Sequence, residues 1–290
     1  MQTKIMTLFT RTPLHVGCGS SVGAVDQPVA RERHTRFPVI PGSAIKGVLA
    51  DLWNEKKKDD DGKTVKIVRS KEGVALFGND DTANASAGKL LIGEGKLLAF
   101  PIRSAKGAFA WLTCPLALNR FKRDSGAKFD VPEVESETSA LVAEKSCLKF
   151  DGGKVIFEEY PLSVSGTIDA AVVAALSDLC DDAVWKELPK RLAVVSDELF
   201  RYFAENACEI ANHNRIDDET GVVANGALFS QENVPSETLF YGVMNAMEGA
   251  HLDQLSKGIE KAGGLLQIGA DATTGLGWCS VTLVAPEAVK

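Results

Sequence analysis

The sequence predicts an α+β protein. Segments with apolar residues at every second position alternate along the chain with segments of helical spacing, which indicates strands and helices arranged around one β core. No tandem repeat of fixed period is present, and no break in composition separates two independent domains. With 290 residues, 45% of them hydrophobic, the chain can bury one large core or two modest ones. We therefore expect a single domain over residues 1–290.

The first elements follow from simple patterns. Residues 4–16 alternate between apolar and polar character, so a half-buried strand is predicted there, ended by the glycines at 17 and 19. A helix is predicted from Ser43, a favourable N-cap, to Asn54. Its apolar residues recur at helical spacing: Ile45, Val48, Leu49, Leu52 and Trp53. This start places Lys46 in the first turn.

The next segments are a charged run and a region rich in glycine. The run at 55–61 contains lysines followed by aspartates and predicts a solvated loop. Two apolar bursts within residues 89–103 are separated by Gly93-Glu94-Gly95, which predicts a pair of strands joined by a glycine turn.

Strands and helices continue to alternate to the end of the chain. The predicted elements are a helix at 115–123 after core residues Phe109, Trp111 and Leu112, a hairpin at 147–160 turning at Asp151-Gly152-Gly153, helices at 170–179 and 196–204 (the latter capped by Ser196), a protruding polar hairpin at 212–235, a strand at 238–244, a helix at 252–262, and strands at 265–268 and 278–284.

Composition argues against several classes of protein. The formal net charge is -7, whereas free-standing nucleic-acid binders usually have a basic surplus, so any RNA contact must be local. The six cysteines include no Cys-x-x-Cys pair, which disfavours zinc and redox motifs. The N-terminus lacks the pattern of a signal peptide, and no apolar run approaches the roughly 18 residues of a membrane span. We expect a reduced, cytoplasmic protein without membrane contact.

Two glycine-rich segments are candidates for ligand contact, with a plain turn as the alternative for each. Residues 17–23 follow a strand, but their spacing is not that of a dinucleotide fingerprint and no helix follows. A small-molecule enzyme with a nucleotide pocket there is therefore only a rival hypothesis. The second segment offers an open backbone and hydroxyl donors, from Gly269, Gly275, Gly277, Thr273 and Thr274.

Positive charge gathers near the predicted helix start at Ser43. Free backbone N–H groups at a helix N-terminus, together with Lys46, attract phosphate, although an ordinary surface lysine is the simpler interpretation. Arg31 and Arg33 have the donor geometry that suits phosphate contact.

Motifs spread over nearly the whole chain resemble one known family. They are Pro41-Gly42-Ser43 with Lys46, and residues 103–115, 214–235 and 269–277. These stretches resemble the RAMP superfamily of CRISPR-associated proteins, in particular the repeated backbone subunit of the type III-B (Cmr) effector complex. The resemblance implies a ferredoxin-like or RRM-like palm with insertions and a β-hairpin thumb at about 212–235. It also implies that the helix start and the second glycine segment bind the backbone of a guide RNA.

Asp26 is the residue for which we expect a catalytic role. RNA supplies its own nucleophile, the 2'-hydroxyl, so a ribonuclease needs in-line geometry, a proton acceptor and compensation of charge. One carboxylate with a divalent ion, Mg²⁺ or Mn²⁺, can supply much of this. A lone loop aspartate is usually a turn residue, but the resemblance places the family's slicing aspartate, and with it the metal ligand, at Asp26.

Three further residues are candidates for cleavage. His15, at the end of the first strand, is suited to proton transfer, with a histidine bonded to backbone as the alternative. Glu237 and Tyr241 lie in the segment predicted as a strand after the thumb.

The resemblance implies an RNA-guided function in defence against invading nucleic acid. The chain is expected to polymerise along guide crRNA as a helical filament, together with other subunits of the effector complex, and to cleave the paired target RNA as an endoribonuclease at regular intervals. A crRNA-binding scaffold of the same shape without catalysis is the alternative within the family.

Overall fold

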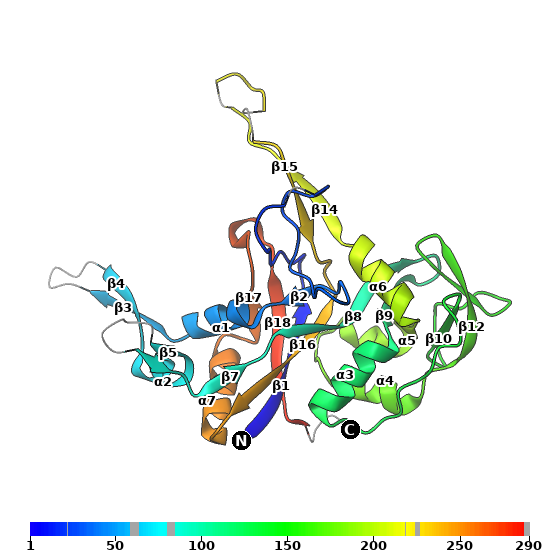
Figure 1. The fold of residues 1–290 in the computed structure, drawn as a ribbon, viewed down its shortest axis with the longest axis horizontal. Coiled ribbons are helices and arrows are strands. Elements are labelled where there is room, and N and C mark those ends of the chain that lie inside the picture. Colours follow the sequence, from blue (N-terminus) through cyan, green and yellow to red (C-terminus); the bar gives the residue numbers. More distant parts are fainter. Residues whose placement is uncertain (22, 59–63, 80–84, 218, 224–226, 287–290) are drawn as a thin grey trace.

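The computed structural model describes residues 1–290 apart from 22, 59–63, 80–84, 218, 224–226 and 287–290. One large sheet forms the backbone of the molecule, and among the described residues it contains 12 strands. Helices pack along this sheet, and a hairpin projects from its middle (Figure 1). The mixed α and β content predicted from the sequence is confirmed.

The first strand lies at the centre of one half of the sheet. β1 (Gln2–Thr10) pairs antiparallel with β16 (Leu239–Ala246) on one side and with β18 (Trp278–Val284) on the other. β17 (Leu265–Gln267) extends the sheet beyond β18, and β8 (Gly95–Ser104) pairs antiparallel with the far edge of β16. The predicted strand at 4–16 therefore ends earlier, at Thr10, because the chain after it leaves the sheet.

Two helices accompany this half of the sheet. α7 (Gly249–Lys261) contacts β1, β16 and β18, and α1 (Gly42–Asp51) follows the short strand β2 (Val39–Ile40). The N-cap of α1 is Pro41 and no side chain caps the helix, so the prediction that Ser43 is the N-cap is wrong. Pro41 has φ -55° and ψ 139°, the extended backbone that is usual for the residue just before the first helical turn. Lys46 consequently lies in the second turn.

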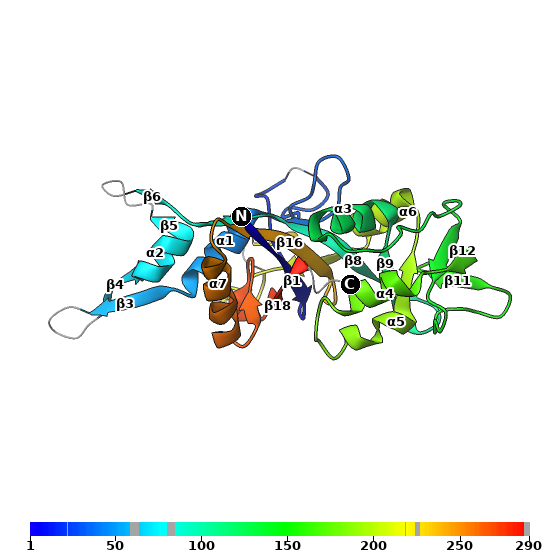
Figure 2. The ribbon, with the colours of Figure 1, turned by 90° about the horizontal axis from the view of Figure 1, so that it is seen from below.

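An insertion separates α1 from β8 and extends the molecule to one side (Figure 2). Its elements are β3 (Asn54–Lys58), β4 (Thr64–Arg69), α2 (Lys71–Phe77), β5 (Gly78–Asn79), β6 (Ser86–Ala87) and β7 (Leu90–Ile92). β3 and β4 form a hairpin. The loop predicted at 55–61 is therefore strand as far as Lys58, and residues 59–61 lie outside the described part of the chain.

The glycines at 93–95 do not form the predicted turn between two paired strands. β7 and β8 lie one after the other along β16, with Ile92 opposite Met244 and Lys96 opposite Tyr241. A Cβ at position 93 would lie 2.9 Å from the carbonyl oxygen of Val243. The glycine thus lets the chain pass close to β16, and it does not reverse the chain direction.

The other half of the molecule continues the sheet from β8. Its elements are β9 (Ala108–Thr113), α3 (Pro115–Ser125), β10 (Ser139–Val142), β11 (Lys154–Phe157), β12 (Tyr160–Thr167), α4 (Ala170–Ser177), a 3₁₀ turn (Trp185–Glu187), α5 (Leu188–Arg191), β13 (Leu192–Val194) and α6 (Asp197–Asn206). The strand order is β8, β9, β13, β10, β12, β11.

The three predicted helices of this half are observed as α3, α4 and α6, whereas α5 was not predicted and the hairpin at 147–160 is displaced. Ser196 caps α6 by accepting a hydrogen bond from the Leu199 amide at 3.1 Å, as expected. The turn at 151–153 closes only a single bridge between Phe150 and Lys154, and the true hairpin joins β11 to β12.

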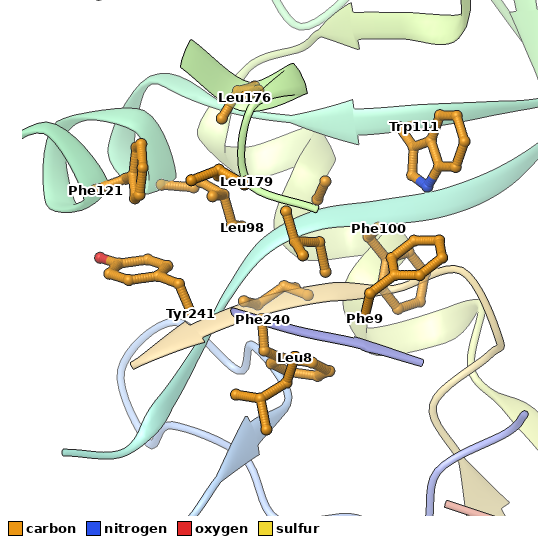
Figure 3. Packing of buried hydrophobic residues seen from close by; sticks show 14 of the residues in the cluster. Leu8, Phe9, Leu98, Phe100, Trp111, Phe121, Leu176, Leu179, Phe240 and Tyr241 are labelled. Carbon is orange, nitrogen blue, oxygen red and sulfur yellow. The ribbon is translucent and has the colours of Figure 1, made fainter. Parts of the chain in front are cut away.

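A continuous apolar core spans both halves (Figure 3). Phe9 of β1, Phe100 of β8 and Phe240 of β16 are 1% exposed or less, and Trp111 of β9 is fully buried. Burying a side chain of this size contributes about 1.5–3 kcal/mol. The core fixes the sheet from which the hairpin projects.

The projecting hairpin consists of β14 (Glu209–His213) and β15 (Phe229–Asn233), which pair antiparallel. It follows α6 directly and projects from the sheet (Figure 1). Among the described residues, no helix combines the length and apolar character that crossing a bilayer requires.

Candidate functional site

The base of the hairpin is where the two predicted glycine-rich segments meet. The N-terminal loop (residues 11–31) lies along the edge of β15 that β14 does not use, with bridges from Leu14 to Val234 and from Gln27 to Gln231. The C-terminal glycine loop (residues 268–277) contacts the N-terminal loop, because the Ala270 amide donates to the carbonyl of His15 at 2.9 Å. Segments from both ends of the chain thus form one surface.

Alternate residues of β15 direct their backbone groups toward the N-terminal loop. The carbonyl of Ser230 accepts from the Gln27 amide at 3.0 Å, and the amide of Glu232 donates to the Gln27 carbonyl at 2.9 Å. In an antiparallel pair, residues alternate between those that bond to the partner strand and those that do not. Ser230 and Glu232 are residues that do not bond to β14, so their backbone groups face the N-terminal loop.

Asp26 lies on this exposed surface and is bonded to Ser230. Its Oδ2 accepts two hydrogen bonds, from the Ser230 amide at 2.7 Å and from the Ser230 hydroxyl at 2.8 Å. The same hydroxyl accepts from the Asp26 amide at 3.0 Å. The Ser230 amide, followed by its hydroxyl, lowers the pKa of the Asp26 carboxyl below its ordinary value. Asp26 is therefore an ionised carboxylate whose Oδ1 has no hydrogen-bond partner within the described part of the protein.

His15 is bonded to the same strand, two residues further along. Its side chain is buried, and Nδ1 lies 2.7 Å from the carbonyl oxygen of Glu232. A carbonyl only accepts, so Nδ1 carries the hydrogen and the lone pair of the neutral ring is on Nε2. Gly17 packs against this ring, since a Cβ there would lie 2.6 Å from Nε2. The backbone-bonded alternative for His15 is thus observed, with one ring nitrogen left for chemistry.

The glycines of the C-terminal glycine loop are required by close packing. Gly269 has φ 83°, and a Cβ there would lie 2.1 Å from the carbonyl oxygen of His15. Gly277 has φ 77°, with the Ile268 carbonyl oxygen 2.0 Å from a Cβ position. Gly275 is also left-handed and ends a 3₁₀ turn (Ala272–Thr274) in which Thr273 and Thr274 are exposed. Contact between these residues and RNA stays a prediction from the resemblance.

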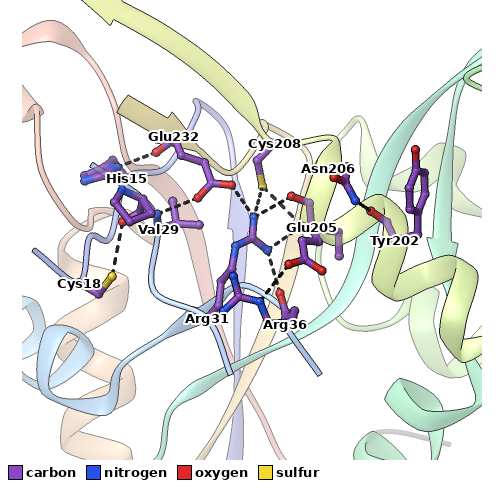
Figure 4. Close-up of polar contacts among 12 residues, drawn as sticks. His15, Cys18, Val29, Arg31, Arg36, Tyr202, Glu205, Asn206, Cys208 and Glu232 are labelled. Carbon is purple, nitrogen blue, oxygen red and sulfur yellow. Dashed lines mark hydrogen bonds and ion pairs between the residues drawn. The ribbon is translucent and has the colours of Figure 1, made fainter. Parts of the chain in front are cut away.

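Arg31 does not present its guanidinium to solvent (Figure 4). The side chain is 5% exposed and pairs with Glu232 at 2.5 Å. It also donates to the carbonyls of Ala204 and Glu205, in the last turn of α6, where a cation is favourable. Phosphate contact by Arg31 therefore conflicts with its burial, and the residue instead holds the N-terminal loop against β15 and α6.

Arg33 lies in the segment 31–36, which three ion pairs anchor to the rest of the protein. They are Arg31 with Glu232, Glu32 with Arg120 of α3, and Arg36 with Glu205 of α6. Between these pairs Arg33 is exposed and has no ion-pair partner among the described residues. Lys46 in α1 is also exposed and has no ion-pair partner among the described residues, and it lies near the exposed, uncharged Ser43. Arg33 and Lys46 are thus the two cations in question. These cations are accessible to phosphate.

The structure does not bring Glu237 and Tyr241 to Asp26. Glu237 precedes β16, so it is not within a strand, and it lines a separate pocket of about 320 Å³ with Arg103 and Glu209. Tyr241 is fully buried under α3, where its hydroxyl donates to Asp124 at 3.0 Å. Burial and the coupling to Asp124 raise the pKa of Tyr241 far above its ordinary value. Contact between Tyr241 and RNA is incompatible with this position.

Glu232 and Ser230 are the site residues that the sequence did not reveal. Glu232 accepts from the Val29 amide at 2.9 Å through Oε2 and from Arg31 through Oε1, while its carbonyl binds His15. The hint in the sequence is the polar run Gln231-Glu232-Asn233, which lies within the predicted protruding hairpin and is entirely buried. Buried polar residues usually have structural partners.

A divalent ion would find few ligands from the protein here. Among the described residues, no group of three His, Cys, Asp or Glu side chains is arranged to hold a metal. Asp26 offers one oxygen, Oδ1. Magnesium is commonly bound by one or two carboxylates together with phosphates of the substrate, so the residues present fit an ion shared with RNA better than one held by protein alone.

The similarity to known proteins extends over nearly the whole chain. The family model of the RAMP superfamily matches residues 7–280. The CRISPR system Cmr endoribonuclease Cmr4 of Pyrococcus furiosus is 37% identical over 295 residues, covering 98% of this chain and 96% of that protein.

Solved structures agree with this relationship. The crystal structure of oligomeric Cmr4 from Pyrococcus furiosus superposes with a TM-score of 0.73 at 30% identity, covering 98% of both chains. A chain of the type III-B Cmr-beta complex bound to cognate target RNA, at 19% identity, has the same fold, with a TM-score of 0.74 and coverage of 100% and 99%. The chain therefore belongs to the RAMP superfamily and, within it, to the family of the Cmr endoribonuclease Cmr4.

Proposed function

We propose that this protein is the repeated backbone subunit of a type III-B CRISPR effector complex, which binds guide crRNA and cleaves complementary target RNA at regular intervals. The relationship to Cmr4 over 98% of the chain supports this assignment. The observation that supports it at the level of residues is the ionised, exposed Asp26, which Ser230 of the hairpin holds by two hydrogen bonds. The cytoplasm remains the proposed location.

A ferredoxin-like palm is the proposed framework. The sheet order β8, β16, β1, β18, with antiparallel neighbours throughout, supports it. The order along the chain also supports this palm, because α1 lies between β1 and β8 and α7 lies between β16 and β18. The hairpin β14–β15 is the proposed thumb, and the segment from β3 to β7 is an insertion.

Cleavage is proposed to proceed by attack of the 2'-hydroxyl on the adjacent phosphate, which forms a 2',3'-cyclic phosphate and breaks the P–O5' bond. Water protonates the 5'-oxygen that leaves. His15 is the proposed acceptor of the hydroxyl proton, through Nε2, because Nδ1 is engaged by the Glu232 carbonyl. Its side chain is buried against Gly17, so this role requires the N-terminal loop to move aside at Gly17 when RNA binds. Asp26 has a lowered pKa and is a weak base, so its contribution is negative charge at a fixed position. A divalent ion bound to Asp26 Oδ1 and to RNA would offset the charge that develops on the phosphate.

RNA binding is proposed to involve the exposed residues around this centre. Arg33 and Lys46 supply positive charge, and Ser43 supplies a hydroxyl in the first turn of α1. The C-terminal glycine loop permits close approach of the RNA backbone at Gly269, Gly275 and Gly277 and offers the hydroxyls of Thr273 and Thr274. All these contacts recognise backbone, which leaves sequence recognition to the guide.

The non-catalytic scaffold remains the second candidate, because one observation favours it. Both Ser230 donors bind Asp26, so the carboxylate also ties the N-terminal loop to the hairpin and would have a purpose without chemistry. The test is cleavage of end-labelled target RNA by the complex assembled from this chain, guide crRNA and the other subunits. Regularly spaced fragments from a complementary target, and none from a scrambled target, are expected. Binding of the target without any fragments would identify a scaffold.

A further inference from the structure

Asp26 depends on a single residue for its orientation. Of the two carboxylate oxygens, Oδ2 receives both hydrogen bonds found among the described residues, and both donors belong to Ser230. The carboxylate is exposed and has no ion-pair partner among the described residues, so neither packing nor an ion pair fixes its rotamer. The Asp26 amide in turn donates a hydrogen bond to the Ser230 hydroxyl.

The position of Ser230 is itself well defined. Its amide and carbonyl face the N-terminal loop, through Asp26 and Gln27, and the pairing with β14 uses the residues on either side. Two residues further on, buried Glu232 binds Val29 and Arg31 of the same loop. β15 therefore holds the N-terminal loop through the buried ion pair of Glu232 with Arg31, and it holds the Asp26 carboxylate through Ser230.

We propose that Ser230 is a positioning residue for cleavage, which turns Asp26 so that Oδ1 faces the target RNA. This inference rests on the proposed function, since it assigns to Ser230 a role in a reaction that Asp26 supports. A catalytic group must be held in its productive geometry, and a misplacement of about 1 Å can cost about 100-fold in rate. Among the described residues, the hydrogen bonds of the Ser230 hydroxyl all go to Asp26, to its carboxylate and to its amide.

Substitutions of Ser230 separate positioning from folding. Ser230→Ala removes the hydroxyl and keeps the amide, so one of the two donors to Asp26 remains. We therefore expect the single-turnover cleavage rate at saturating target to fall about tenfold, which is less than the roughly 100-fold cost of a full misplacement. Target affinity should remain within about threefold. Ser230→Thr keeps the hydroxyl and suits a strand, so it should restore cleavage to within about threefold. Ser236→Ala is the matched control, because Ser236 follows β15 and has no recorded contact with Asp26.

A second variant removes both donors. Ser230→Pro lacks the amide hydrogen as well, and because that amide does not bond to β14 the ladder of the hairpin stays intact. We expect about a 100-fold loss of rate.

The outcomes are distinguishable when Asp26→Asn is measured beside these variants in the assembled complex. If Ser230→Ala cuts like wild type while Asp26→Asn does not, Ser230 has no positioning role. If Ser230→Ala and Ser230→Thr lose target affinity and cleavage together, the role of Ser230 is structural and the proposal fails. If Asp26→Asn itself cuts at the wild-type rate, the proposed role of Asp26 fails, and positioning fails with it.

Discussion

Two arginines that look equivalent in the sequence have opposite surroundings. Arg31 and Arg33 are two residues apart, a spacing that in a strand would put both side chains on the same face. Arg31 forms a single bridge with Pro38, however, and Arg33 lies in the turn between them. Arg31 faces Glu232 and the end of α6, whereas Arg33 faces solvent. What the sequence lacked was the position of Glu232, which lies 201 residues away.

This difference predicts contrasting effects of alanine substitution. Arg31→Ala leaves the buried carboxylate of Glu232 without its partner and should lower the free energy of unfolding by about 3 kcal/mol. Arg33→Ala should leave stability within about 0.5 kcal/mol, as for other surface changes, and weaken RNA binding. Denaturant unfolding and RNA titration of both variants measure these effects. Equal stability of the two variants would contradict the assignment.

Asp26→Asn tests the central residue directly. The amide keeps the size of the side chain and an oxygen that can accept from Ser230, while the negative charge is lost. We expect the cleavage rate to fall at least about 100-fold, with target affinity within about threefold, which corresponds to roughly 0.7 kcal/mol. The measurement is single-turnover cleavage with Mg²⁺ in the assembled complex, beside a binding titration. A parallel loss of affinity would show that the carboxylate mainly holds the loop.

At the scale of elements, local patterns were sufficient to find strands and helices but not their partners. β18 was predicted with its observed bounds, and α3, α6 and α7 were found to within a few residues. The pairing of β7 and β8 was wrong, because a short glycine segment predicts a turn when only neighbouring residues are considered. Their shared partner β16 lies more than 130 positions further on and cannot be read from local spacing.

Lys46 lies in the second turn of α1, and its prediction concerns this helix. Lys46→Ala should weaken binding of all RNA sequences alike and reduce the slope of log affinity against log salt by roughly one unit, the value for one phosphate contact. Stability should barely change, because the side chain is exposed. Lys186→Ala is a control, since Lys186 is an exposed lysine in the other half of the molecule, paired with Asp181. An unchanged salt slope would remove Lys46 from the RNA interface.

Shortening the hairpin should preserve the fold. Beyond the paired residues 209–213 and 229–233, the described apolar side chains of the tip are exposed, from 44% for Val223 to 67% for Leu228. Replacing residues 217–225 by a short glycine linker removes no core, so cooperative thermal unfolding should persist. The regular spacing of cuts in target RNA should become less distinct. An insoluble variant, or one that melts without cooperativity, would mean that the tip supports the core.

At the scale of the whole molecule, a net charge of -7 has to be reconciled with RNA binding. The exposed cations near the site are few, so affinity should depend on many copies bound to one guide. We expect the purified chain with guide RNA to form helical assemblies visible by negative-stain microscopy, with co-purifying RNA detected by the absorbance ratio. Monodisperse single copies at saturating guide RNA would argue against the filament.

The central place of β1 has a consequence for how the protein is made. β1 is synthesised well before its two neighbours in the sheet, β16 and β18. At about 5–20 residues per second, the N-terminal strand waits on the order of ten to fifty seconds for its partners. During that time its apolar side chains are unpaired, and His15 and Asp26 lack the strand that holds them. A nascent or truncated chain should therefore be a client of chaperones, and it should be unable to cut the cell's own transcripts.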